Sequence, residues 1–86
     1  MDINELISII KTKLKNNFQV QNIKIEDKSF LHKNHKGNQE GKFHIKISLK
    51  SDQLKGMKKI ESNKKIFKIL ENEIKNFIHS IQILLD

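Results

Sequence analysis

The sequence predicts an α+β fold in which helices cover one face of a small three-stranded sheet. Three observations lead to it: an N-terminal stretch with helical periodicity, a central stretch that alternates strictly between apolar and polar residues, and a C-terminal helical stretch that runs into a second alternating segment. Successive helix–strand and helix–helix–strand units of this kind pack as two layers around one core. The 86 residues, 36% of them apolar, suffice for a single domain over residues 1–86.

The N-terminal half is expected to contain one helix, one strand and a loop. Residues 2–16 carry an apolar stripe at helical spacing, with acidic residues first and lysines last, as the helix dipole favours. Residues 18–26 are expected to form a strand, with a break in the alternation at Gln21-Asn22 that indicates a bulge or bend. Residues 27–41 show no period and contain two glycines, so we expect a loop, long enough to be functional or disordered.

The C-terminal half begins with the clearest strand pattern, over residues 42–50, where Phe43, Ile45, Ile47 and Leu49 predict a buried face and the residues between them a wet one. A turn or single helical turn should follow and end at Gly56. Next comes a helix capped by Ser62 or Asn63, with its apolar stripe over residues 66–77. In residues 79–85 the odd positions His79, Ile81, Ile83 and Leu85 fall on one face of an extended chain, which predicts the closing strand.

Composition excludes several classes of protein. Because the chain has no cysteine, it has neither a disulfide framework nor a thiolate metal site of its own. No apolar run approaches the ~18–20 residues of a membrane span, and the N-terminus lacks the basic region of a signal peptide, so a cytoplasmic location is expected. The net charge of +7 comes entirely from lysine, which predicts a solvated surface more than specific recognition of nucleic acid.

An ordered set of residues resembles the BolA family over nearly the whole chain. It comprises Ile25-Glu26-Asp27-Lys28-Ser29, His32, His35-Lys36-Gly37, Ser51, Leu54, Gly56, Ile66-Phe67, Leu70 and Ile78-His79-Ser80-Ile81. The resemblance implies an αββααβ fold, similar to a class II KH domain without its GXXG loop. It also implies an adaptor that binds a monothiol glutaredoxin as a heterodimer and shares a [2Fe–2S] cluster with it, in iron–sulfur trafficking or iron regulation.

The resemblance makes histidines the candidate cluster ligands, since histidine can replace cysteine at one iron of such a centre. His79 is the first candidate, although a histidine at a helix end can also simply interact with the last carbonyls. His32 or His35 would be the second ligand, and the sequence does not separate them from each other or from solvated loop residues. The partner's cysteine and its glutathione would supply the sulfur. His44 is expected to be an ordinary surface histidine on the polar face of its strand.

The alternative function is weak, sequence-tolerant nucleic-acid binding by a transcriptional regulator. Its candidate residues are the lysines around the start of the long helix: Lys58, Lys59, Lys64, Lys65 and Lys68. The family usually has Arg-His-Arg there, where this chain has Ser62-Asn63-Lys64, which argues against specific readout. Asp27 and Ser29 are expected to cap a strand end, and no group of residues suggests an enzyme.

Overall fold

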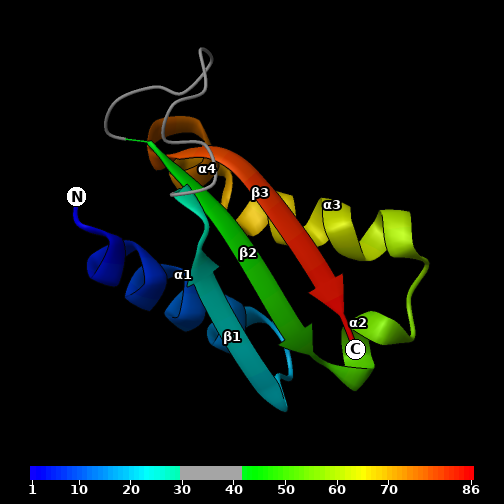
Figure 1. The fold of residues 1–86 in the computed structure, drawn as a ribbon. Helices are drawn as coiled ribbons and strands as arrows, with labels where there is room; N and C mark the ends of the chain where they lie inside the picture. Colours follow the sequence, from blue (N-terminus) through cyan, green and yellow to red (C-terminus); the bar gives the residue numbers. More distant parts are fainter. Residues whose placement is uncertain (30–41) are drawn as a thin grey trace.

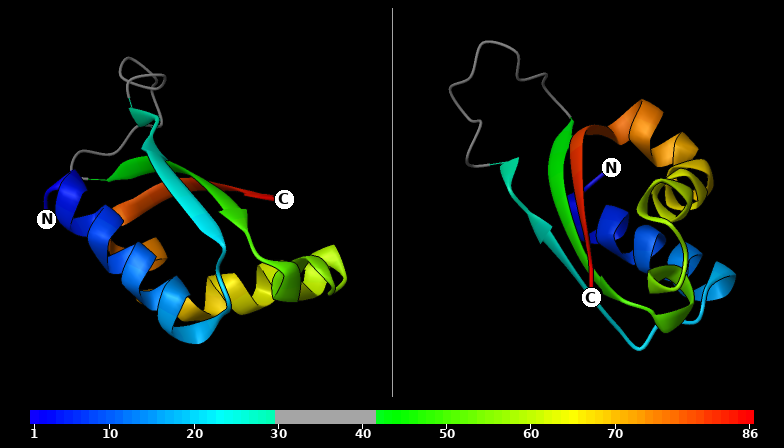
Figure 2. Two further views of the ribbon diagram at one scale, coloured as in Figure 1. Left: turned by 90° about the horizontal axis from the view of Figure 1, so that it is seen from below. Right: turned by 90° about the vertical axis from the view of Figure 1, so that its right-hand side faces the viewer.

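The computed structural model describes residues 1–29 and 42–86 and shows two layers, a three-stranded sheet with helices on one face (Figures 1 and 2). The elements in chain order are α1 (Ile3–Asn17), β1 (Asn22–Asp27), β2 (Phe43–Lys50), α2 (Asp52–Lys55), α3 (Lys59–Ile69), α4 (Glu71–Phe77) and β3 (Ile78–Leu85). β2 is the central strand, antiparallel to β1 and parallel to β3. The predicted fold class is confirmed.

The core fills the space between the helices and the inner face of the sheet. Residues of β2 at positions 45, 47 and 49 are buried there, as the alternation predicted. They meet the buried stripes of the helices, and the whole cluster consists of Leu6, Ile10, Leu14, Ile25, Ile45, Ile47, Leu49, Leu54, Ile66, Leu70 and Ile78. No helix in residues 1–29 or 42–86 is long and apolar enough to cross a membrane.

Helix α1 agrees with its predicted range to within a residue at each end. Asp2 caps it, since its carboxylate accepts the amide N–H of Asn4 at 2.6 Å. The helix is tied to α4 by an ion pair, in which Lys13 Nζ lies 2.7 and 2.9 Å from the two carboxylate oxygens of Glu73. This pair fixes α4, and therefore the residues that follow it, against the first helix of the chain.

Strand β1 begins later than predicted, at Asn22 instead of residue 18. The backbone before it bonds to the region of α2: Gln19 donates its N–H to Gln53 Oε1 at 2.8 Å and accepts the hydroxyl of Ser51. These partners lie outside the ladder, and bonding to β2 starts only at Gln21, whose N–H donates to the carbonyl of Lys50 at 2.8 Å. The break in alternation predicted at Gln21-Asn22 marks the start of the strand.

The long C-terminal helix also differs from its prediction. It begins at Lys59, preceded by Lys58, which provides no side-chain cap, and Leu70 divides it into α3 and α4. The predicted cap at Ser62 or Asn63 is wrong, because both residues lie inside α3. Ser62 is fully buried and its hydroxyl donates to the carbonyl of Lys59 at 3.0 Å, the local bond by which serine is accommodated within a helix.

Candidate functional site

His79 lies at the start of β3, where the chain passes directly from α4 into the sheet (Figure 1). The register of β3 against β2 shifts here, since Phe43 pairs with Ile78 but His44 pairs with Ser80. His79 is therefore an extra residue without a partner of its own in the β2 ladder, as in a β-bulge. Its side chain is exposed. A bulge at a strand end commonly changes the direction of a side chain, and at this bulge the imidazole of His79 is exposed to solvent.

His44 is the neighbour of His79, and its predicted surface position is wrong. It is only 3% exposed, and its ring centroid lies 4.9 Å from that of His79, with the rings tilted by 59°. Its Nδ1 is 2.7 Å from the hydroxyl oxygen of Ser80, and the imidazole tautomer decides which of the two donates. The alternation correctly predicts that His44 lies on the face of the sheet away from the helices. It does not predict that the side chain is buried on that face.

The backbone around His44 is also held by the end of β1. Its N–H donates to Ser29 Oγ at 3.1 Å, and its carbonyl accepts the N–H of Lys28 at 2.7 Å. Asp27 in turn accepts the N–H of Ser29 at 2.9 Å, which is the turn-capping role predicted for these two residues. Hydrogen bonds from the end of β1 and from β3 therefore hold His44 in place. The exposed His79 ring packs against the His44 ring.

The surroundings of the two histidines are cationic. A hollow beside them on the open face of the sheet is lined by Lys28, Lys46, Ser80 and Gln82, together with His44, Ile45 and Ile81. Glu26 partly balances this charge through ion pairs with Lys28 at 2.7 Å and Lys24 at 3.2 Å. The bonds from Lys28 and then Lys24 lower the pKa of Glu26 to about 2. An anionic ligand would therefore be favoured at this end of the sheet.

The described residues do not form a complete metal site by themselves. Within residues 1–29 and 42–86, no three histidine, cysteine, aspartate or glutamate side chains are grouped closely enough to hold a metal ion. Thiolates are absent from the sequence. The described part of this site offers His79 and the buried His44, while His32 and His35 lie outside the described residues, so the predictions for them stay predictions. A metal group with four ligands would need donors beyond the described residues.

Comparison with protein families decides the classification. The family described as BolA-like protein matches residues 14–85. The chain belongs to the BolA family. This BolA-like protein is also 29% identical over 75 residues to the DNA-binding transcriptional regulator BolA of Haemophilus influenzae, covering 87% of this chain and 70% of that protein.

Solved structures agree with the fold. BolA1 from Arabidopsis thaliana matches with a TM-score of 0.77 and 23% identity, over 92% of this chain and 87% of that one. The BolA domain of SufE1 from the same plant gives 0.75 and 23%, with the same coverage. A bol-like protein from Babesia bovis gives 0.69 and 17%, over 91% and 79%. At these identities the likeness shows that the BolA-like chain shares their fold.

The lysines of the alternative function are spread along α3 in this BolA-like protein, from Lys58 just before its first residue to Lys68 in its last turn. All five are exposed: Lys58, Lys59, Lys64, Lys65 and Lys68. They belong to α3 and the residue before it, whereas His44 is on β2 and His79 is on β3. The structure therefore separates the two sets of candidate residues, and a variant in one set should leave the other set intact.

Proposed function

We propose that this BolA-like protein is a binding adaptor that shares a [2Fe–2S] cluster with a monothiol glutaredoxin, contributing His79 and one loop histidine, His32 or His35. One observation carries the proposal: an exposed imidazole stands at a bulge, backed by a buried histidine that is itself fixed by Ser80. A ligand held in this way needs little ordering when a partner binds, which reduces the entropic cost of association.

The chemistry of the site supports a cluster with ligands from two proteins. Two neutral imidazoles can serve one iron of a [2Fe–2S] centre, and thiolates of a partner and its glutathione can serve the other. Thiolates and the carboxylates of glutathione are negatively charged, so the cationic hollow around Lys28 and Lys46 favours their approach. His44 is assigned as the support of His79, because it is only 3% exposed and its ring packs against the exposed ring of His79.

The test is anaerobic reconstitution of the mixed proteins with iron and sulfide, followed by visible circular dichroism. We expect a spectrum distinct from that of the glutaredoxin alone, lost in His79→Ala and in whichever of His32→Ala or His35→Ala removes the second ligand. Gln82→Ala is the matched control, since Gln82 is an exposed residue on the same strand and beside the same hollow. An unchanged spectrum in His79→Ala would remove the ligand assignment.

Nucleic-acid binding is the second candidate function. The exposed lysines of α3 favour it, as does the name of the Haemophilus influenzae relative. Lysine contacts to phosphate predict an affinity that falls steeply with salt and depends little on sequence. Lys64→Glu with Lys65→Glu should weaken binding of duplex DNA and reduce the slope of affinity against salt, while leaving the cluster spectrum unchanged. If the pair of substitutions leaves DNA affinity intact, α3 is not the contact surface.

A further inference from the structure

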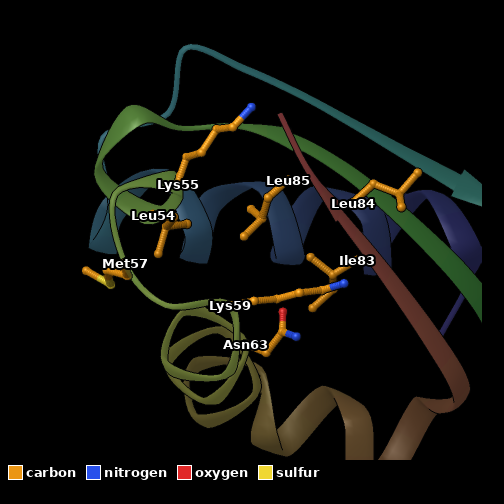
Figure 3. A pocket seen from close by; sticks show the side chains of 8 residues that line it. All are labelled: Leu54, Lys55, Met57, Lys59, Asn63, Ile83, Leu84 and Leu85. Carbon is orange, nitrogen blue, oxygen red and sulfur yellow. The ribbon is translucent and has the colours of Figure 1, made fainter.

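A second hollow lies at the far end of β3, between that strand and the turn that joins α2 to α3 (Figure 3). Its volume is about 270 Å³, and it is lined by Leu54, Lys55, Met57, Lys59, Asn63, Ile83, Leu84 and Leu85. The strand rises ~3.3 Å per residue, so Leu84 lies roughly 17 Å from His79 along β3. We call this hollow the β3 groove. It is separate from the histidine site.

One wall of the β3 groove is the outer edge of the sheet. β3 pairs with β2 on one side, and the described residues place no strand on its other side. Asp86 donates its N–H to the carbonyl of Leu49 in β2 at 2.9 Å. Since backbone groups alternate in direction along a strand, the N–H and C=O groups of Ile81, Ile83 and Leu85 point away from β2. An edge of this kind can accept an additional strand.

The rest of the groove combines aliphatic surface with positive charge. Figure 3 shows Leu85 directed toward Leu54, Lys59 extending across the opening to Ile83, and Lys55 at the edge with its side chain pointing away from the other lining residues. None of the eight lining residues is acidic. Lys58, next to this rim, is exposed and has no cap bond to the helix. The groove is therefore apolar at its base and cationic at its mouth.

We infer that the β3 groove binds an extended acidic segment of a partner protein, which adds to β3 as a fourth strand. Main-chain hydrogen bonds to Ile81, Ile83 and Leu85 would supply the pairing, as in recognition by strand addition. Alternate apolar side chains of the segment would enter the hollow, and its carboxylates would meet Lys55 and Lys59.

Two other occupants fit less well. Single-stranded nucleic acid is usually held by aromatic or arginine side chains on which bases stack, and the lining contains neither. A second copy of the chain would bring together two molecules of net charge +7, with the lysines of both near the shared edge. Charge complementarity therefore selects an acidic peptide from a different protein.

The test is a titration of the full chain with a short fluorescent peptide that alternates glutamate and leucine, followed by anisotropy and amide hydrogen exchange. We expect saturable binding and new protection of the amides of Ile81, Ile83 and Leu85. The even-numbered amides of β3 already face β2, so their exchange should change little. Lys55→Glu with Lys59→Glu should raise the Kd about tenfold, because each change removes an attraction and adds a repulsion.

Controls separate the alternatives. Lys64→Glu with Lys65→Glu makes the same change in net charge outside the groove and should leave the Kd within about twofold. A peptide with lysine in place of glutamate should not bind. The proposal is overturned if the acidic peptide leaves the three odd-numbered amides unprotected, if an oligothymidylate protects them in its place, or if they become protected by self-association when the chain alone is concentrated.

Discussion

Replacing Lys13 by methionine should destabilise the domain far more than an ordinary surface substitution does. The carboxylate of Glu73 is buried, with its side chain 4% exposed, and Lys13 is its charged partner at 2.7 Å. Methionine keeps the apolar stem of lysine but leaves this carboxylate without a counter-charge. Among residues 1–29 and 42–86, the amide of Asn72, 3.2 Å from Glu73 Oε2, is the one group that would still donate a hydrogen bond to it.

The magnitude follows from the burial of the pair. Removing one partner of a fully buried ion pair costs about 3–5 kcal/mol. Because the Lys13 side chain is 37% exposed, water can partly solvate the carboxylate after the substitution, and we reduce the expected loss to about 2 kcal/mol. For a domain of this size such a loss lowers the Tm by about 8–16 °C.

The assay is a double-mutant cycle in urea, followed by far-ultraviolet circular dichroism. Glu73→Leu alone should cost less than Lys13→Met, because the remaining lysine can extend into water. The double variant should come within about 1 kcal/mol of the parent, since an apolar pair can replace a buried ionic one. A double variant that loses as much as the two single variants together would refute the reasoning.

Three further predictions concern single positions. Ser80→Ala should cost about 1–3 kcal/mol in urea unfolding, because the buried Nδ1 of His44 loses its 2.7 Å partner; an unchanged midpoint would mean that this bond contributes nothing. Glu26, whose folded-state pKa is lowered from 4.5 to about 2, should add stability that is complete above about pH 5 and is lost as the pH falls toward 2. Glu26→Gln should therefore flatten the stability profile over that interval, and parallel profiles for parent and variant would contradict the assignment. Gly56→Ala should change stability by less than about 1 kcal/mol, since φ is −71° and a new Cβ would lie 3.4 Å from the carbonyl oxygen of Asp52; a larger loss, measured by thermal unfolding, would show that the turn cannot accept a side chain.

Local patterns predicted the elements whose own residues carry a clear helical or alternating period. The stripe of α1 and the alternation of β2 fixed both elements to within a residue or two. The errors arose where distant groups compete for the backbone. Gln19 bonds to residues more than 30 positions away, so β1 starts late, and Ser62 is buried inside α3, where its hydroxyl cannot act as an N-cap.

The candidate site was predictable only in part for the same reason. His79 was identified through the family resemblance, but the importance of His44 depends on the register of β2 against β3, which no local pattern contains. The shift between Phe43 and His44 brings Ser80 opposite His44 and leaves His79 beside it. The sequence carries one relevant signal: a histidine and a serine occupy open-face positions in β2 and β3, which are neighbours in the sheet.

The parallel pairing of β2 with β3 has a consequence for how the domain assembles. β1 and β2 are consecutive antiparallel strands, whereas β3 reaches β2 only after the chain has passed through three helices, so His44 and Ser80 meet across 36 positions of sequence. Such non-local contacts form late, because their loop-closure entropy must be overcome first. Both the imidazole pair and the outer edge used by the β3 groove depend on this last strand. Detachment of β3 would remove the histidine pair and the groove edge together. A ligand bound at either of these two sites would stabilise the attached state of β3, and so would slow its detachment.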